Sequence, residues 1–266
     1  MNWYEIIKQK EYLYVIREKL DRIEPRFLTK YINMFLLLGH HIALLIDTGS
    51  GLFPLKPVID KLIGERKLMV FNTHSHFDHR GSNSEFEKIY IHENEINEIS
   101  IPFDVSFLKE SPNQLVKLYQ EKNFKLPAAN NIQPLKDGAE FNLDGIQIKV
   151  IHTPGHSNGS ICLLTNKGEL FTGDTAHYGS MYLPIKEEFP IILNSLHKLI
   201  QQFATNDNLQ LYPSHEEYAI DKDLLIKLHD GIQNIENIWE TRVHDDFLEC
   251  FILKDEIFRY VIQKNY

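Results

Sequence analysis

The stretch THSHFDHRGSN, residues 73–83, constrains the fold and chemistry of this chain more than any other feature. It places three histidines and one aspartate within six consecutive positions, namely His74, His76, Asp78 and His79. Imidazole rings fill an apolar core poorly, and a surface loop gains solubility more simply from lysine or glutamate. The density of coordinating side chains therefore indicates a metal site.

The apolar segment KLMVFN precedes this cluster and predicts a strand, so the cluster follows the end of a strand, where α/β proteins usually place their chemistry. Side chains two positions apart in an extended chain point the same way, so His74 and His76 can share one ion. Asp78 and His79 lie in the following turn and reach a different point. Two adjacent metals explain such a set better than one.

Further ligands must converge to displace the hydration shell of a divalent cation. Three candidates follow strand-like segments later in the chain: His156 in TPGHSNGS, Asp174 in ELFTGDTAHYGS and His215 in LYPSHEEY. Each lies where an apolar strand meets a turn-rich loop, so we expect all three at one sheet edge. The predicted set is five histidines and two aspartates.

Hydrophobic patterning predicts strands and helices that interleave in two similar halves. We expect strands near 12–20, 33–38, 42–46, 67–72, 88–92, 132–135, 139–143, 146–153, 160–165, 169–173 and 209–213, and a hairpin over 249–263. We expect helices near 54–64, 82–88, 187–204 and 221–240, with mainly helical structure over 93–130. Asp144-Gly145 predicts a hairpin turn. The fold class is α/β (α+β), with two sheets and helices outside.

Composition narrows the partners. The 266 residues suffice for one domain spanning 1–266, with a partly helical cap or insertion around 93–130. The net charge of −9 argues against a nucleic-acid partner. Cys162 and Cys250 do not form a disulfide framework. The apolar stretch 33–49 is too short and interrupted to span a bilayer, and the start MNWYEIIKQK has no leader, so we expect a cytoplasmic protein. A homodimer is compatible with the sequence.

The ordered set Asp47 in IDTG, His74-x-His76-x-Asp78-His79, His156, Asp174 and His215 resembles the five-motif pattern of the metallo-β-lactamase superfamily. The resemblance runs from about residue 30 to about 220. Within that superfamily, the segments NMFLLL, LIDTGSGL, TPGHSNGSICLL and TGDTAHYGS resemble acyl-CoA thioesterase-like proteins, and also glyoxalase II and acyl-homoserine lactonases.

The resemblance implies a four-layer αββα sandwich with a dinuclear site, most simply zinc, with manganese or iron as alternatives. It assigns His74, His76 and His156 to one metal, and Asp78, His79 and His215 to the other. Asp174 would bridge the two metals. Asp47 would orient a ligand histidine from behind, as outer carboxylates commonly do.

This resemblance implies a hydrolase in which a metal-bridging hydroxide attacks an acyl carbonyl, with Asp78 holding the proton of the nucleophile. The favoured substrate is a small-molecule thioester of the acyl-CoA or acylglutathione type, and a lactone or another ester is the alternative. Asp174 disfavours a β-lactamase, and His76 disfavours a flavodiiron oxygen reductase. A persulfide dioxygenase and a metal-containing binding protein without turnover also stay open.

Further residues near the motifs are candidates for lining the pocket or for packing. Lactonase-like relatives carry a tyrosine after the bridging aspartate that donates to the substrate carbonyl; Tyr178 and Tyr182 are both available here, and Tyr178 is the expected donor unless it packs. His177 is a candidate for lining the pocket, and Cys162 for a buried apolar position. The following histidines are expected on the surface or in structural roles: His40, His41, His92, His152, His197, His229 and His244.

Overall fold

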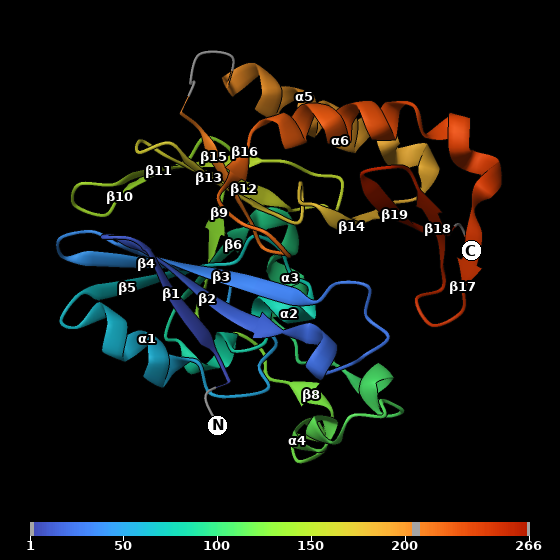
Figure 1. Ribbon diagram of the computed structural model, residues 1–266. Coiled ribbons are helices and arrows are strands. Elements are labelled where there is room, and N and C mark those ends of the chain that lie inside the picture. Colours follow the sequence, from blue (N-terminus) through green and yellow to red (C-terminus); the bar gives the residue numbers. More distant parts are fainter. Residues whose placement is uncertain (1–2, 204–207, 265–266) are drawn as a thin grey trace.

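The structure is a computed structural model that describes residues 3–203 and 208–264. Two large sheets lie face to face, and helices cover their outer faces (Figure 1). In the figure α5 (Phe189–Phe203) and α6 (Asp223–Gln233) lie side by side above one sheet, and α1 (Lys56–Ile63) lies on the far side of the other. The expected αββα sandwich is therefore confirmed.

The first sheet has seven strands in the order β1-β2-β3-β4-β5-β6-β9. Their bounds are Glu5–Lys10, Leu13–Lys19, Tyr31–Leu38, Ile42–Ile46, Lys67–Phe71, Ile89–His92 and Ile132–Leu135. Strands β4 and β5 are parallel, with Ile46 opposite Phe71. The residues that follow them, Asp47 and Thr73-His74, therefore emerge at the same sheet edge.

The second sheet has six strands in the order β10-β11-β12-β13-β15-β16. Their bounds are Glu140–Asn142, Gln147–His152, Ile161–Thr165, Glu169–Gly173, Gln210–Pro213 and Ile220–Asp221. Strands β13 and β15 are parallel, with Gly173 opposite Pro213, so Asp174 and His215 leave the sheet together. Asp144 and Gly145 both have positive φ in the β10–β11 turn, which confirms the expected hairpin.

Three apolar clusters hold the layers together. Between the sheets, Phe35 and Phe71 of the first sheet pack with Val150, Phe171 and Tyr212 of the second. A second cluster joins the first sheet to α1 and to residues 96–129, and a third joins the second sheet to α5 and α6. Each sheet is thus buried on both faces, which explains its long apolar runs.

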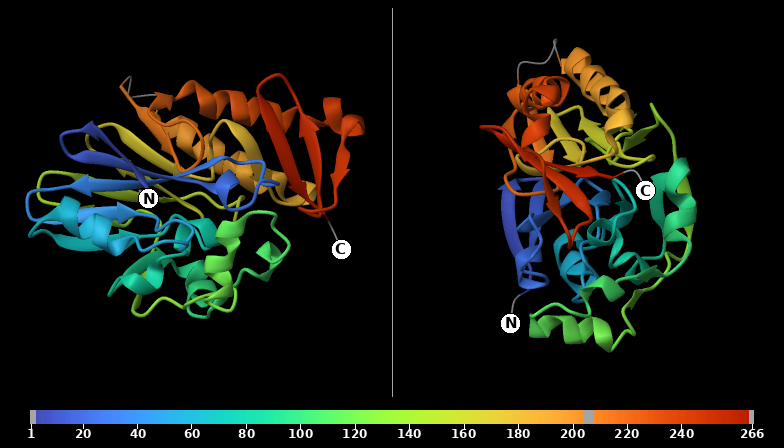
Figure 2. Two further views of the ribbon diagram at one scale, coloured as in Figure 1. Left: turned by 60° about the horizontal axis from the view of Figure 1, so that its bottom comes forward. Right: turned by 90° about the vertical axis from the view of Figure 1, so that its right-hand side faces the viewer.

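A third sheet, which the sequence did not predict, is built by the C-terminal tail and a strand from the middle of the chain. Its order is β14-β19-β18-β17, with bounds Gly179–Leu183, Phe258–Gln263, Cys250–Lys254 and Val243–Asp245. The expected tail hairpin is β18–β19, and β19 pairs in parallel with β14. Figure 2 shows this sheet at the end of the sandwich, alongside both halves.

Two helical expectations are wrong in part. Residues 82–88 form only a short 3-10 turn, Asn83–Glu85. The segment 93–130 contains two four-residue helices, α3 (Ile96–Ile99) and α4 (Lys117–Gln120), and a two-stranded sheet of β7 (Phe103–Asp104) and β8 (Lys125–Leu126). No helix among the described residues has the length and apolar character needed to cross a membrane.

Candidate metal centre and apolar cavity

The candidate ligands come from loops that follow strands of both large sheets, and the two sheet edges are tied together where they meet. His74 follows β5, His156 lies in the β11–β12 loop, and Asp174 and His215 follow β13 and β15. The backbone N–H of Ile161 donates to the carbonyl of Thr73 at 3.0 Å, which joins the second sheet to the histidine cluster. Residues from distant parts of the sequence are therefore brought to one place.

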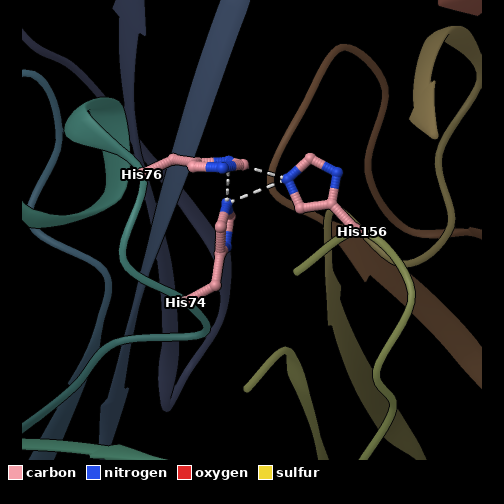
Figure 3. A group of neighbouring side chains, drawn as sticks. All are labelled: His74, His76 and His156. Carbon is pink, nitrogen blue, oxygen red and sulfur yellow. Dashed lines mark hydrogen bonds between the residues drawn. The ribbon is translucent and has the colours of Figure 1, made fainter. Parts of the chain in front are cut away.

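Three histidines form the first group of candidate ligands (Figure 3). His74 Nε2 lies 3.0 Å from His76 Nδ1 and 3.1 Å from His156 Nε2, and the latter two nitrogens lie 2.9 Å apart. His156 Nδ1 donates to the carbonyl of Tyr182 at 2.9 Å, which leaves the Nε2 lone pair facing the other two rings. Nitrogens gathered in this way fit one shared cation.

The protonation of these rings suits metal binding. Burial lowers the pKa of His74 well below its usual value and lowers the pKa of His156 to about 4. Both imidazoles are therefore neutral near pH 7, which is the form that ligates a metal. His76 is the exposed member of the group.

Asp78, His79 and His215 form the second group, and the Asp174 carboxylate lies between the two groups. Asp174 Oδ1 is 3.3 Å from His79 Nε2, and Asp174 Oδ2 is 3.0 Å from His215 Nε2 and 3.5 Å from His156 Nε2. Burial opposes ionisation of Asp174, but His215, His79 and His156 hold its pKa well below the usual value. Burial also opposes protonation of His79 and His215, but the surrounding carboxylates raise the pKa of both.

Two atoms in this second group test whether a cation fits. His79 Nε2 and the nearby Asp174 Oδ1 are buried 3.3 Å apart, and neither forms a hydrogen bond with any described residue. A buried polar atom without a partner is unfavourable by about 1–3 kcal/mol. A divalent cation coordinated by these atoms would remove that deficit, and the imidazole and carboxylate donors suit zinc, manganese or iron.

Asp47 supports the second group from behind. Its carboxylate accepts from the backbone N–H of Thr73 at 2.7 Å, from Thr73 Oγ1 at 2.9 Å, from His79 Nδ1 at 2.8 Å and from Ser214 Oγ at 3.2 Å. The contact with His79 fixes the proton on Nδ1 and leaves Nε2 directed at Asp174. The position is the one expected for an outer carboxylate.

A cavity of about 300 Å³ opens directly onto this cluster. His76, Asp78, His156, Asp174 and His215 form its floor. The walls are mainly apolar and come from the N-terminal part, the middle and the C-terminal tail of the chain: Leu20, Phe27, Phe77, Phe103, Leu183, Leu248, Cys250 and Val261. An apolar cavity above a polar floor suits a substrate with a hydrocarbon part and one reactive polar group.

Of the two tyrosines that follow Asp174, only Tyr182 lines the cavity. The ring of Tyr178 stacks on Phe258, with centroids 6.0 Å apart, and does not line the cavity. Tyr182 lines it instead, and burial raises the pKa of that phenol, so its hydroxyl stays protonated. His177 also stays outside the cavity: its Nδ1 donates to the carbonyl of Tyr178 at 2.7 Å, and its ring packs edge-on against His215.

Two buried charged residues that sequence reasoning missed hold the ligand loops in place. The Glu95 carboxylate accepts from the backbone N–H of Gly159 at 2.7 Å and from the hydroxyl of Ser157, directly after His156. Arg80, directly after His79, donates to the carbonyls of Glu98 and Ile101. The segment 95–101 therefore holds both ligand loops in place. The one sign of this role is that Glu95 and Arg80 are charged residues at buried positions.

The histidines expected outside the metal centre lie outside it. His40, His41, His197 and His244 are exposed, and none belongs to a group of candidate ligands within the described chain. His92 is buried and stacks on His152, with ring centroids 3.9 Å apart. Cys162 and Cys250 are buried free thiols.

Comparison with known proteins agrees with this geometry. The family model described as metallo-beta-lactamase superfamily matches residues 29–217. The human protein named acyl-coenzyme A thioesterase MBLAC2 is 29% identical over 200 residues, covering 68% of this chain and 69% of the relative. A protein of Emericella nidulans named atrochrysone carboxyl ACP thioesterase is 28% identical over 177 residues, covering 65% of this chain and 47% of the relative.

Solved structures share the fold at lower identity. A beta-lactamase domain protein from Burkholderia ambifaria superposes with a TM-score of 0.66 at 16% identity, covering 89% of this chain and 79% of that one. A metallo-beta-lactamase family protein from Thermus thermophilus gives a TM-score of 0.61 at 21% identity, covering 83% and 79%.

Proposed function

Because the chain belongs to the metallo-beta-lactamase superfamily, we propose that it is a hydrolase that uses two divalent metal ions, zinc in the first instance, to cleave a thioester. One observation carries the proposal. Seven side chains from distant segments converge under a single apolar cavity, and Asp174 lies between two groups that can each hold an ion. A structural zinc site is usually a closed tetrahedron rich in cysteine, which this cluster is not.

In this proposal His74, His76 and His156 hold one metal, and Asp78, His79 and His215 hold the other, with Asp174 shared. Bound divalent ions lower the pKa of water towards neutrality and polarise a carbonyl, which supplies both a nucleophile and an electrophile near pH 7. Asp78 lines the cavity floor and can accept the proton of the attacking water. Tyr182 offers a protonated hydroxyl beside the reacting carbonyl, in the role that the sequence assigned to Tyr178.

The thioester is favoured by the cavity and by the relatives. The apolar walls of the 300 Å³ cavity suit an acyl chain, so we call it the acyl cavity. The similar proteins are named as thioesterases of acyl-CoA and of acyl carrier protein substrates. In the reaction, water adds to the carbonyl carbon and the carbon–sulfur bond breaks. The products are a carboxylate, a free thiol and one proton, and no redox partner is needed.

The test compares two substrate classes with metal-loaded protein. Acyl-CoA hydrolysis is followed by thiol release, and acyl-homoserine lactone opening is followed by acid release. We expect thiol release that stops on chelation and in Asp174→Ala, together with a lower metal content in that variant. Turnover of the lactone alone would replace the thioesterase proposal by a lactonase, and metal binding without turnover of any acyl substrate would favour a binding protein.

A further inference from the structure

A second hollow, of about 230 Å³, lies next to the acyl cavity at the C-terminal sheet. Its lining includes Lys186 after β14, Trp239 in the 3-10 helix Ile235–Thr241, Phe251 in β18, and Gln263 and Lys264 at the end of β19. We call it the C-terminal hollow. Gln263 lines both this hollow and the acyl cavity, so the two are neighbours across one side chain.

Cations gather over the aromatic rings of the C-terminal hollow. The Trp239 and Phe251 rings have centroids 6.2 Å apart at an angle of 66°. Lys186 Nζ lies 4.1 Å from the indole centroid, and Lys264 Nζ lies 5.2 Å from the Phe251 centroid. The Arg242 guanidinium lies 5.2 Å from the centroid of the Trp239 ring and 5.6 Å from that of Phe251. Lys186 and Lys264 line the hollow, and Arg242 lies beside it against both rings, so three cations and two aromatic rings meet here.

The acidic residues nearby do not cancel this charge firmly. Lys186 pairs with Glu236 and Arg242 pairs with Glu240, but the two glutamate side chains are 65% and 92% exposed. Exposed ion pairs contribute about 0–1 kcal/mol and yield to a competing anion. A third acidic residue, Glu187, also lines the hollow, and its side chain is likewise exposed to solvent.

Arg26 precedes the cavity-lining Phe27, and its guanidinium is committed to another partner. Arg26 Nη2 and Nε lie 2.8 and 2.9 Å from the two oxygens of the buried Glu24 carboxylate, a bidentate pair. Arg26 also stacks on Phe247. An anionic group on a substrate therefore finds available cations at the C-terminal hollow and not at Arg26.

We propose that the C-terminal hollow binds the nucleotide end of a coenzyme A thioester, which deepens the proposed function and rests on it. The adenine packs against Trp239, and the phosphates contact Lys186, Arg242 and Lys264. A heteroaromatic base with attached phosphates matches this combination of rings and cations. The pantetheine arm then runs past Gln263 and places the thioester over the metal centre, with the acyl chain in the apolar cavity. An acyl group on a carrier protein brings no nucleotide and leaves the hollow empty.

The kinetic test uses one acyl group on two carriers, acyl-CoA and acyl-pantetheine, with the metal-loaded full chain. Loss of a base stacked on an aromatic ring weakens binding by about tenfold or more. We expect Trp239→Ala to raise KM for acyl-CoA by about tenfold with kcat unchanged, and to leave KM for acyl-pantetheine unchanged. Lys264→Gln should raise KM for acyl-CoA by a smaller factor. The matched control is Lys56→Gln, an exposed lysine on α1, which should change neither substrate.

Equal kinetics of the two thioesters in the wild-type protein, or an equal change of both in Trp239→Ala, would overturn this inference while leaving the thioesterase proposal intact. Hydrolysis of neither thioester by the wild-type protein would instead refute the proposed function. A binding measurement then tests separately whether the hollow binds a nucleotide. The probe is adenosine 3′,5′-bisphosphate, which carries the base and phosphates without the thiol. We expect calorimetric binding that weakens with salt and is lost in Trp239→Ala, and absence of binding to the wild-type protein would overturn the inference.

Discussion

The carboxylate behind the metal centre offers a sharp test of the two-metal arrangement. Asp47 is fully buried and lies with φ at +63°, a conformation that asparagine also tolerates. The substitution Asp47→Asn therefore keeps the backbone and the side-chain volume, and replaces one acceptor oxygen by a donor. The variant therefore tests the hydrogen bonds of the carboxylate with little change of shape.

The geometry leaves the amide no good orientation. If its oxygen faces His79 Nδ1, its NH₂ group faces the backbone N–H of Thr73 across the former 2.7 Å contact. If it is flipped, the NH₂ group faces His79 Nδ1 and favours the tautomer with the proton on Nε2, the atom that would hold the metal. Removing a hydrogen bond to a charged group costs about 1.5–3 kcal/mol.

We expect this variant to weaken metal binding at the Asp78, His79 and His215 group by about 10–100-fold, in line with other changes behind metal ligands. Binding at the His74, His76 and His156 group should stay within about threefold, because Asp47 does not contact those rings. Competition with chelators of graded affinity, with metal counted per chain, resolves the two classes. Unchanged binding at both groups, or equal loss at both, would refute the reasoning.

Two controls separate this effect from a general loss of stability. Asp144→Asn makes the same chemical change at another residue of positive φ, in the exposed turn between β10 and β11. It should leave both metal affinities unchanged. Ser214→Ala removes the longest contact of Asp47, at 3.2 Å, and should alter binding at the second group by only about threefold.

The site supports four further predictions. Glu95→Gln should weaken metal binding at the three-histidine group by about tenfold, because the charged acceptor of the Gly159 N–H is lost. The control is Glu93→Gln: Glu93 pairs with the exposed Lys136, and its substitution should not change the metal content. On acidification from about pH 8 to about pH 5, the second group should lose its metal first. The pKa values of His79 and His215 are raised, so protons compete with the metal there, whereas His74 and His156 stay neutral. Measurement of the metal bound per chain after dialysis at each pH checks this order. Tyr182→Phe should lower kcat for acyl-CoA by about tenfold or more, and Tyr178→Phe should not, since only the former lines the cavity; equal rates in both variants would remove the hydroxyl from the mechanism. Val261→Phe narrows the acyl cavity and should lower kcat/KM for long acyl chains more than for short ones. An equal loss for all chain lengths would show that this wall does not determine which acyl chain lengths are accepted.

The ligand positions could be predicted from the sequence because each depends on local pattern. A strand of period two followed by a turn-rich loop predicts where its next residue emerges, and parallel neighbours such as β4 and β5 emerge together. The orientation of Tyr178 and Tyr182 could not be predicted in this way. The sequence did not predict β14, and only the pairing of that strand with β19, far along the chain, decides which tyrosine faces the cavity.

The short elements between 82 and 130 show a different limit. The sequence predicted mainly helical structure there, but the helices that form are only four residues long. Helices of that length have little intrinsic stability, so tertiary contacts decide their bounds. Buried Arg80 and Glu95 supply such contacts, and neither residue can be recognised as a brace before its neighbours across the fold are known.

The candidate metal ligands and the residues that shape the cavity come from different parts of the chain. All seven candidate ligands fall within residues 29–217, the range that matches the superfamily. Much of the cavity wall falls outside that range: Leu20, Phe27, Leu248, Cys250, Val261 and Gln263. The tail also contributes Trp239, Phe251, Gln263 and Lys264 to the lining of the hollow that we assign to the nucleotide. Changes in the tail can therefore alter the acyl chain and the carrier that the protein accepts while the metal centre stays constant, because the tail contributes walls and cations but no candidate metal ligand.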